Sequence, residues 1–402
     1  MHSLFLGTSF MKKIIFTEEF CQPENLFPFT LTRQIQDLRV GILTIREKWE
    51  LMLGLESGDR KEDDYKDLDR AVDLSAAGEK DEFFLVHGNV LPTPSIIRAV
   101  KKLKTGEFLS APNQTGFAFR FTGREIIGDH EIRVKNAVNI DETIRCIRYP
   151  WDIVSLNDWA IRQDFQLLTR KRKSAAVSSS NRLVGKKDIF FEKGAVAEHC
   201  ILNASTGPIY IGRDAELMEG SMIRGPFAMG EGALLKMGST IYGATTLGPR
   251  CIGAGEIKNT VMSGYSNKAH HGYLGDSVIG EWCNLGAGTT NSNLKNNVGT
   301  INMWTPGGPV SAGTKCGVMM GDYTRTAINT SINTGTVIGV SANVFGSGLT
   351  PKYIPSFSWG SEGIRRYEAD KAIRDASGWK KLKQQEMTDN DIKILQHIYQ
   401  NF

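Results

Sequence analysis

An apolar residue stands at every sixth position over a long stretch of the second half of the chain. The first run of this pattern consists of Ile211, Leu217, Ile223, Met229, Leu235, Ile241 and Leu247. Four positions after them come Ala215, Ser221, Phe227, Ala233, Ser239, Thr245 and Cys251, small in all but one case. The period returns at Ile279, Leu285, Met320, Thr326, Ile332, Ile338 and Val344. A period of six predicts a strand and a corner per hexapeptide, three of which close one triangular coil of a left-handed parallel β-helix.

One coil cannot cover its own apolar face, so the coils must stack through parallel backbone hydrogen bonds. The 42 glycines of the chain suit the tight corners between strands. The period is interrupted around residues 264–272 and 294–314, and at both places we expect a loop that leaves the coil, where function is often located. After Trp359 the spacing over residues 367–385 and 391–399 predicts C-terminal helices that cap or flank the last coil.

The first half of the chain shows short apolar runs that alternate with helical spacing. Buried strands are predicted at residues 12–16 and 83–86, and helices at residues 45–53, 95–104 and 156–168. This alternation predicts an α/β unit with a partly parallel sheet, whose ligands bind at the carboxyl ends of the strands. With a serine-rich stretch near Ser178 as the boundary, we expect an α/β domain over residues 11–164, a linker over 165–185, the β-helix over 186–359 and a helical segment over 360–402.

The composition is that of a globular protein of two or three domains. Hydrophobic residues make up 41% and charged residues 23%, and a net charge of +4 is small for 402 residues, so no nucleic-acid partner is indicated. The charge run over residues 59–70 is predicted to form a solvated face, and the basic cluster over 170–173 to end a helix. Without a run of about 18 apolar residues, no membrane span is predicted.

The cysteines and the first residues bear on the compartment. Six widely spaced cysteines without a CxxC pair favour neither a disulfide framework nor a zinc site, and they fit a reducing cytoplasm. Residues 1–10 lack the charged segment and cleavage site of a signal peptide. We interpret them as an alternative start or an extension, with Met11 opening the fold.

A string of residues within the repeat carries the strongest functional signal. Residues 267–276 read NKAHHGYLGD, and residues 279–289 read IGEWCNLGAGT. This string closely resembles the acetyltransferase domain of the bifunctional N-acetylglucosamine-1-phosphate uridylyltransferase/glucosamine-1-phosphate acetyltransferase family, over about residues 211–347. The resemblance implies acetyl transfer from acetyl-CoA to glucosamine 1-phosphate or a related amino-sugar phosphate. It also implies a homotrimer with sites between neighbouring subunits.

The resemblance carries particular roles over to particular residues. The histidine three positions before the tyrosine is the family's general base, which corresponds to His270, and an imidazole suits proton transfer near neutral pH. His271 points elsewhere if the backbone is extended, so we leave it out of the catalytic set. Substrate-binding positions correspond to Lys258, Tyr273, Asn284 and, with an insertion of about four residues, Lys236. Acetyl-CoA contacts correspond to Ala287 and Asn293, and Asn293 is also able to orient the base.

The chain departs from the family just after this string. The segment 294–314 does not resemble its family counterpart, and a family lysine within it has no match unless Lys295 serves. Asp322 stands where the family has a serine. The contacts to the rest of the coenzyme are therefore not carried over.

By the same resemblance the first half should be a nucleotidyltransferase that uses UTP or dTTP with Mg²⁺. Such domains place a glycine-rich loop after their first strand, because bare backbone amides must approach the phosphates. Here residues 17–33 contain no glycine, and Asn89 stands where a metal-binding aspartate is expected. Arg33, Arg39, Arg46 and Lys48 remain candidates for a phosphate clamp, with surface or structural arginines as an equal alternative. We expect a divergent or degenerate nucleotidyltransferase.

Three functional hypotheses follow. The first is an acetyl-CoA-dependent N-acetyltransferase, with or without nucleotidyl transfer, that contributes to UDP-N-acetylglucosamine and cell-envelope glycan synthesis. The second is a sugar-1-phosphate nucleotidyltransferase whose β-helix only assembles or regulates it. The third is a non-catalytic scaffold. His270 within its matched string favours the first hypothesis, because a purely structural β-helix does not require it.

Overall fold

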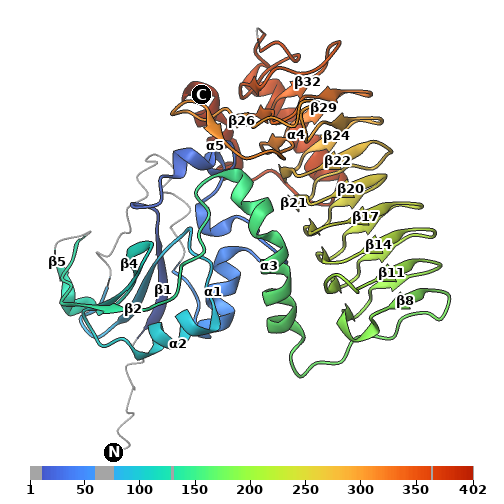
Figure 1. Cartoon of the computed structure of the whole chain (residues 1–402). Helices are drawn as coiled ribbons and strands as arrows, with labels where there is room; N and C mark the ends of the chain where they lie inside the picture. Colours follow the sequence, from blue (N-terminus) through green and yellow to red (C-terminus); the bar gives the residue numbers. More distant parts are fainter. Residues whose placement is uncertain (1–10, 59–76, 128–130, 364, 402) are drawn as a thin grey trace, which may run out of the picture. The chain divides into compact units, whose positions relative to one another are not determined.

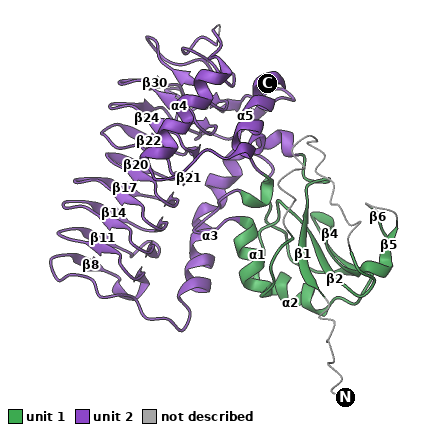
Figure 2. Cartoon of the chain, turned by 180° about the vertical axis from the view of Figure 1, so that it is seen from behind, with its two compact units in different colours: residues 1–22, 34–37, 45–147 green, residues 23–33, 38–44, 148–402 purple. Residues whose placement is uncertain are grey.

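The computed structural model describes residues 11–58, 77–127, 131–363 and 365–401. These residues form two compact units, shown in different colours in Figure 2. Within the described ranges, unit 1 comprises residues 11–22, 34–37 and 45–147, and unit 2 comprises residues 23–33, 38–44 and 148–401. The predictions for residues 1–10 and for the charge run from Asp59 to Arg70 fall outside the described residues.

Unit 1 is built on a mixed sheet in the order β1-β2-β4-β3-β7. Its strands are β1 (Lys12–Thr17), β2 (Glu82–His87), β3 (Glu107–Ala111), β4 (Gln114–Thr122) and β7 (Asn136–Asn139). The pairs β1–β2 and β3–β7 are parallel, whereas β4 runs antiparallel to both of its neighbours. The predicted partly parallel sheet is therefore confirmed. A short antiparallel pair of β5 (Ile126–Ile127) and β6 (Glu131–Ile132) also belongs to this unit.

Two helices pack on this sheet, α1 (Ile45–Leu53) and α2 (Pro94–Lys102). Thr93 caps α2 by accepting a hydrogen bond of 3.2 Å from the amide of Ile96, and Pro94 suits the first turn because its missing N–H needs no partner there. The indole of Trp49 on α1 is fully buried and donates to the carbonyl of Val90 at 2.9 Å. The helix positions agree with the apolar spacing read from the sequence.

Unit 2 contains the predicted β-helix, whose coils stack in Figure 1. Its first face consists of β8 (Arg182–Val184), β11 (Ile201–Asn203), β14 (Met222–Arg224), β17 (Thr240–Tyr242), β20 (Glu256–Lys258) and β22 (Tyr273–Gly275). Its second face consists of β9 (Ile189–Phe191), β12 (Ile209–Ile211), β15 (Phe227–Met229), β18 (Thr245–Leu247), β21 (Val261–Gly264), β23 (Val278–Glu281), β28 (Met319–Met320), β31 (Val337–Ile338) and β33 (Tyr353–Ile354). Neighbouring strands within each face are parallel.

The third face is made of β10 (Val196–Ala197), β13 (Glu216–Leu217), β16 (Leu234–Leu235), β19 (Ile252–Gly253), β24 (Asn284–Leu285), β29 (Arg325–Thr326) and β32 (Asn343–Val344). Asn267 joins the two parts of this face, because it bridges both Ile252 and Asn284 in parallel. A further parallel pair consists of β25 (Thr290–Asn291) and β30 (Ser331–Ile332). Three faces in parallel register confirm the hexapeptide coil.

The interior of the β-helix is the apolar column that the sixfold period predicted. None of the seven aliphatic residues from Ile211 to Leu247 is more than 2% exposed, and the residues four positions later are at most 1% exposed. At about 25 cal/mol per Å² of apolar surface removed from water, this column is a main source of the stability of the unit.

The two interruptions of the period have different structural origins. Around residues 264–272 the chain stays in the coil, since Asn267 bridges Ile252 below and Asn284 above. These coils are simply shorter than three hexapeptides, and a shortened coil breaks the phase in the same way as an insertion, so the predicted loop was wrong. The second interruption does leave the coil and folds as a hairpin of β26 (Asn302–Met303) and β27 (Val310–Ser311).

The corner between the second and third faces uses aromatic residues where glycine was expected. Tyr265, Trp282, Tyr323 and Phe357 occupy the left-handed region, with φ between 55° and 61°. A non-glycine residue there costs roughly 1–2 kcal/mol. The cost is offset because these rings belong to an apolar cluster completed by the two C-terminal helices, α4 (Ala369–Leu382) and α5 (Asp389–Asn401). The helices therefore flank several coils.

The long helix α3 (Pro150–Thr169) belongs to unit 2. Its residues Ile161 and Phe165 pack with outward-facing residues of the second face, among them Phe190 and Tyr210. Because this helical face is buried on the β-helix, the units divide before Arg148, whereas the sequence placed the boundary at residue 164, inside the helix. None of the helices in the described ranges is long and apolar enough to cross a membrane.

A part of the first fifty residues also belongs to unit 2, and we name residues 23–33 and 38–44 the N-terminal strap. The ring of Phe27 lies edge-on to Trp304 at 5.1 Å and to Tyr353 at 6.0 Å between ring centroids. The amide of Gly41 donates to the side chain of Asn157 at 2.8 Å. The strap is thus bound both to α3 and to the hairpin of the 294–314 segment.

Candidate active site

The register of the first face sets a group of polar side chains beside one another. Lys258 pairs with Tyr242 on the coil below and with Gly275 on the coil above. Glu256 pairs with Tyr273 in the adjacent row. Between these rows Ile257 points inward and is fully buried, so the polar side chains point outward.

Tyr242, Glu256 and Lys258 form the lower part of this group. The Tyr242 hydroxyl donates to Oε1 of Glu256 at 2.5 Å, and Nζ of Lys258 lies 5.6 Å from the centre of the tyrosine ring. The hydrogen bond to Glu256, together with burial, raises the pKa of Tyr242 to about 12. The phenol therefore stays neutral at physiological pH, and Lys258 is the cation of the group.

Asp276 organises the upper part. Its carboxylate is 7% exposed and accepts hydrogen bonds from the side-chain amides of Asn259, at 3.1 Å, and Asn293. The same amide nitrogen of Asn293 also donates to the hydroxyl of Tyr273 at 3.0 Å. Burial, and then the charge of Asp276, holds the pKa of Tyr273 well above its usual range. The phenol is neutral, and its proton is available to a ligand oxygen.

Gly275 allows Tyr273 to take this position. A Cβ atom at residue 275 would lie 2.2 Å from the hydroxyl oxygen of Tyr273, far inside van der Waals contact. The tyrosine side chain therefore lies over the strand where a neighbouring side chain would otherwise stand. Of the YLGD string, Tyr273, Gly275 and Asp276 thus act together in one arrangement.

His270 and His271 lie on the corner between the third and first faces, and both are exposed. The carbonyl of His270 accepts a hydrogen bond of 2.9 Å from Nζ of Lys268, and the carbonyl of His271 accepts one of 3.1 Å from the amide of Gly288. The backbone of the corner is therefore fixed while its imidazoles face outward. An exposed imidazole on a fixed backbone is compatible with the predicted role of His270 as general base.

The predicted site residues divide between two faces. Lys258, Tyr273 and Asn293 come together around the first face, whereas Asn284 lies on the third face in register with Asn267 and Arg325. Ala287 lies next to the corner of the third face, where its carbonyl accepts from the amide of Asn329 at 2.7 Å.

Two assignments differ from the expected geometry. Lys236 follows β16 on the third face, so the residue beside Lys258 on the coil below is Tyr242. Among the described residues, the hydrogen bonds of the Asn293 side chain go to Tyr273 and Asp276 and none goes to His270. A direct orientation of the base by Asn293 is therefore absent from this part of the structure.

Sequence reasoning missed Tyr242, Glu256, Asn259 and Asp276. Asp276 had a signal, because it closes the matched string, but its two amide partners are on other coils. Tyr242 had none, because the shortened coils hide which residue of one coil pairs with which residue of the next.

Asp322, which stands where the family has a serine, is bound by a residue of the strap. Asp322, 2% exposed, is bound by the guanidinium of Arg33, which also forms an ion pair of 3.1 Å with Glu281. Two carboxylates hold the pKa of Arg33 above its usual range against the effect of burial. The family serine is thus replaced by a carboxylate whose partner comes from the N-terminal sequence.

The three arginines considered for a phosphate clamp each have a partner within their own unit, as expected for structural arginines. Arg33 is committed to Asp322 and Glu281, Arg46 pairs with Asp37 at 2.6 Å, and Arg39 donates to the carbonyl of Ser263 at 3.1 Å. Each guanidinium therefore satisfies a group of its own unit. The reason is that a buried arginine needs carboxylate or carbonyl partners, which these neighbours supply.

The carboxyl end of β2 in unit 1 carries neutral buried groups. His87 is 1% exposed, accepts at Nδ1 from Gln114 at 3.1 Å and stacks on Phe20. Burial lowers the pKa of His87 to about 4, so the imidazole is neutral. Asn89 donates to the carbonyl of Ile147 at 3.2 Å. Nε2 of His87 and Oδ1 of Asn89 are buried without a hydrogen-bond partner among the described residues.

These groups are poor ligands for Mg²⁺. The ion prefers carboxylate and water oxygens, and Asn89 offers an amide at the predicted position. Within the ranges that the structure describes, no group of three or more His, Cys, Asp or Glu side chains could hold a metal ion. The residues at this edge do not fit a magnesium site.

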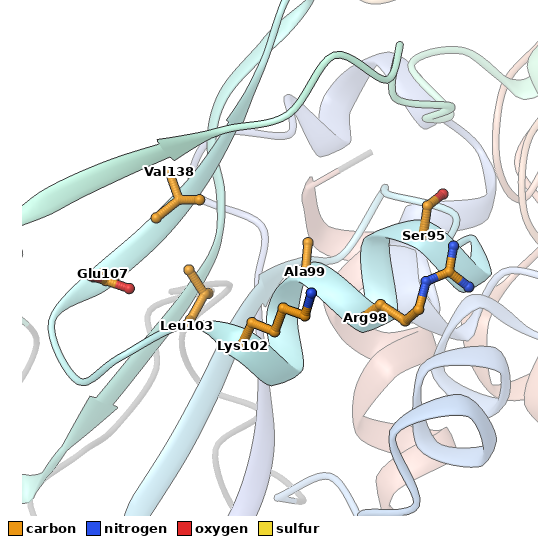
Figure 3. Close-up of a pocket in the computed structure, with 7 residues that line it drawn as sticks. All are labelled: Ser95, Arg98, Ala99, Lys102, Leu103, Glu107 and Val138. Atoms are coloured by element: carbon orange, nitrogen blue, oxygen red, sulfur yellow. The ribbon is translucent and has the colours of Figure 1, made fainter.

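A pocket of about 360 Å³ lies elsewhere in unit 1, between α2 and the strands β3 and β7 (Figure 3). Its lining consists of Ser95, Arg98, Ala99, Lys102, Leu103, Glu107 and Val138. None of the residues predicted as functional belongs to it. Its two cations, Arg98 and Lys102, stand one turn apart on exposed positions of α2.

The chain is similar to known proteins in both halves. Residues 14–173 match the sugar nucleotidyl transferase family. A bifunctional sugar-1-phosphate nucleotidylyltransferase/acetyltransferase of Sulfurisphaera tokodaii is 30% identical over 230 residues, 54% of this chain and 51% of that protein. The bifunctional protein GlmU of Methanococcus vannielii is 24% identical over 213 residues, 52% of this chain and 45% of that protein.

A shorter relative is named as an acetyltransferase alone. The uncharacterized acetyltransferase YaiX of Escherichia coli is 30% identical over 164 residues, 40% of this chain and 71% of that protein. The chain spans about half the length of the two bifunctional relatives. The similarity to YaiX covers 71% of that acetyltransferase at 30% identity, so the chain belongs to the same family of acetyltransferases, and its first half is similar to sugar nucleotidyl transferases.

Proposed function

We propose that this chain is an N-acetyltransferase that transfers the acetyl group of acetyl-CoA to glucosamine 1-phosphate or a related amino-sugar phosphate. The observation that carries the proposal is the outward cluster of Lys258, Tyr273 and Asn293 on one side of the exposed His270 corner. A cation suits a phosphate, and neutral hydroxyl and amide groups suit sugar hydroxyls. The printed names of the bifunctional relatives and of the acetyltransferase relative support the same reaction class.

His270 acts as the general base in this proposal. The imidazole takes a proton from the amine as its nitrogen attacks the thioester carbonyl. The new C–N bond forms, the C–S bond breaks, and coenzyme A leaves with its sulfur protonated. Lys258 binds the phosphate, and the neutral phenol of Tyr273 donates to a ligand oxygen. Asn293 has its amide nitrogen committed to Tyr273 and Asp276, which leaves its oxygen to face the reactants. By resemblance, Ala287 and Asn293 contact acetyl-CoA.

Nucleotidyl transfer is the second candidate, because residues 14–173 match the sugar nucleotidyl transferase family. Its substrates would be UTP or dTTP and a sugar 1-phosphate. The neutral His87 and Asn89 at the end of β2 speak for a low rate. Together the two activities would supply UDP-N-acetylglucosamine in the cytoplasm for cell-envelope glycans.

A homotrimer is the proposed assembly. Large apolar side chains lie exposed on the first face and its corner, namely Ile201 at 43%, Met222 at 48%, Met237 at 66% and Ile328 at 71%. Exposed apolar groups that share a face with the candidate site indicate an interface beside it. Light scattering should give about three times the chain mass of 44.5 kDa. A fully active monomer would contradict the proposal.

One assay tests the activity directly. Acetyl-CoA consumption is measured with a panel of amino-sugar phosphates that differ in the position of the amine and in the sugar. We expect turnover with glucosamine 1-phosphate or a close relative and none with the N-acetylated sugar. Absence of turnover with every amine of the panel would reject the N-acetyltransferase.

A further inference from the structure

Lys268 occupies a position where the β-helix normally places an aliphatic side chain. Asn267 bridges Ile252 below and Asn284 above. The next residue therefore falls in the interior column, in the row of Gly253 and Leu285. Lys268 is 2% exposed. A lysine inside an apolar column is costly, because burial removes the hydration of its ammonium group.

Two backbone carbonyls receive this ammonium group. Nζ of Lys268 donates to the carbonyl of Ala254 at 2.9 Å and to the carbonyl of His270 at 2.9 Å. Among the described residues no carboxylate forms an ion pair with it. The charged group whose field reaches it is Glu256 on β20, and the titratable groups next to it are the imidazoles of His270 and His271. The lysine therefore ties the corner that bears both histidines to the coil below.

The same corner is held tightly from outside. A Cβ atom at Gly255 would lie 3.0 Å from Cα of His271, and one at Gly272 would lie 2.2 Å from the carbonyl oxygen of Thr289. The corner is thus packed between the backbones of two neighbouring coils. Lys268 adds a contact from inside, at the carbonyl of His270 itself.

We propose that Lys268 is a positioning residue, which sets the place of His270 through the backbone carbonyl of that residue and so controls acetyl transfer from inside the β-helix. The inference rests on the proposed function for its effect on the rate. It goes beyond that function because no atom of Lys268 needs to touch a substrate. The proposal requires that the two hydrogen bonds of Lys268 matter more for the reaction than the packing of its alkyl chain.

The tie depends on charge. Burial, partly opposed by Glu256, lowers the pKa of Lys268 to about 8. Below that pH the ammonium binds the two carbonyls through charge-assisted hydrogen bonds, and above it the neutral amine binds them more weakly. We therefore expect the rate of acetyl transfer to fall above about pH 8, because Lys268 loses its charge there.

Three variants separate this role from core packing. Lys268→Met keeps the alkyl chain and removes both hydrogen bonds, Lys268→Arg keeps a permanent charge, and Leu217→Ala opens the same interior column several coils away. We expect Lys268→Met to lower kcat about tenfold, with KM little changed and no alkaline limb. Lys268→Arg should recover part of the rate and shift the limb beyond pH 10. Leu217→Ala should lower stability and leave the shape of the pH profile as in the wild type.

A readout without turnover keeps this test apart from that of the proposed function. Hydrogen exchange of peptides covering residues 266–274 should be faster in Lys268→Met than in the wild type and near wild type in Leu217→Ala, whether or not the protein acetylates any tested amine. If Lys268→Met does not fold, the wild-type profile and Lys268→Arg decide. Unchanged exchange at the corner in Lys268→Met, or a wild-type kcat that stays flat to pH 10, would overturn the proposal.

Discussion

The two halves of the chain each place polar side chains where their family has a reaction centre, but they treat these side chains in opposite ways. At the end of β2 the groups are neutral and sealed, with His87 1% and Asn89 3% exposed. On the first face of the β-helix, Lys258 and Glu256 are charged, and Tyr273 and Asn293 are partly exposed. A reaction centre needs access and charge, so we expect the second half to catalyse the faster reaction.

The largest expected difference is between the two activities. With UTP or dTTP, Mg²⁺ and a sugar 1-phosphate, we expect turnover below about 0.01 per second, about a thousandfold under the median enzyme. The reason is the neutral amide of Asn89 and the lack of glycines in residues 17–33 to cradle phosphates. Pyrophosphate release measures it. The variant Asn89→Asp should not restore turnover by itself, and wild-type turnover near 10 per second would reverse the comparison.

Because His87 is buried as a neutral imidazole, we expect unit 1 to lose stability at acid pH. Its pKa is about 4 in the folded chain and 6.5 when exposed, so the unfolded chain binds the proton first as the pH falls. The stabilisation is complete above about pH 6.5 and is lost towards pH 4, by on the order of 3 kcal/mol. Calorimetry between pH 7 and 4 should show that the difference in unfolding free energy between wild type and His87→Gln becomes smaller as the pH falls. His199→Gln, at an exposed histidine, is the control. If stability falls with pH equally in wild type and His87→Gln, His87 is not buried as a neutral imidazole.

At the exposed site of the β-helix, His270→Ala should lower kcat of acetyl transfer at least about a hundredfold, the usual contribution of a positioned general base. KM should change little, because Lys258 and Tyr273 still bind the substrate. The fold and assembly should persist, since the imidazole is exposed. His271→Ala is the matched control on the same corner. If it were the more damaging of the two, the base would have to be reassigned.

The smallest expected effect concerns Asp276. Asp276→Asn keeps the shape but sets an amide N–H against one of its two donors, Asn259 or Asn293. Hydrogen bonds to a charged group are worth about 1.5–3 kcal/mol, so we expect about a tenfold loss in kcat/KM. Glu231→Gln, on an exposed ion pair with Arg213, serves as the control. Steady-state kinetics with full activity in Asp276→Asn would show that the carboxylate does not position Tyr273.

Local regularity explains what could be predicted from the sequence. Residues such as Ile241 and Leu247 repeat with a period that belongs to one architecture, and the helix expected at residues 95–104 is found as α2, one residue earlier at its start. Residues 264–272 were misjudged because a shortened coil and an inserted loop break the period alike. The boundary at residue 164 was misplaced because the buried face of α3 shows its partner only in three dimensions.

The site was predictable only where one continuous string carries it. His270 and Tyr273 were found through the matched string, whereas the partnership of Tyr242 with Lys258 depends on the lengths of intervening corners. The pair of Arg33 and Asp322 joins residues that are 289 positions apart. No local pattern encodes such a pair, because each partner alone has the appearance of an ordinary surface charge.

The N-terminal strap limits where the protein can be divided into independent parts. Residues 23–33 and 38–44 are bound by the β-helix, although the sequence on either side of each belongs to the other unit. A fragment that begins at residue 148 would therefore lose the guanidinium that neutralises Asp322 and Glu281, and it would expose the ring contacts that Phe27 makes. The two halves therefore cannot be separated at a single position in the sequence. A chimaeric protein that joins this β-helix to another N-terminal domain has to keep residues 23–33 and 38–44 together with the β-helix.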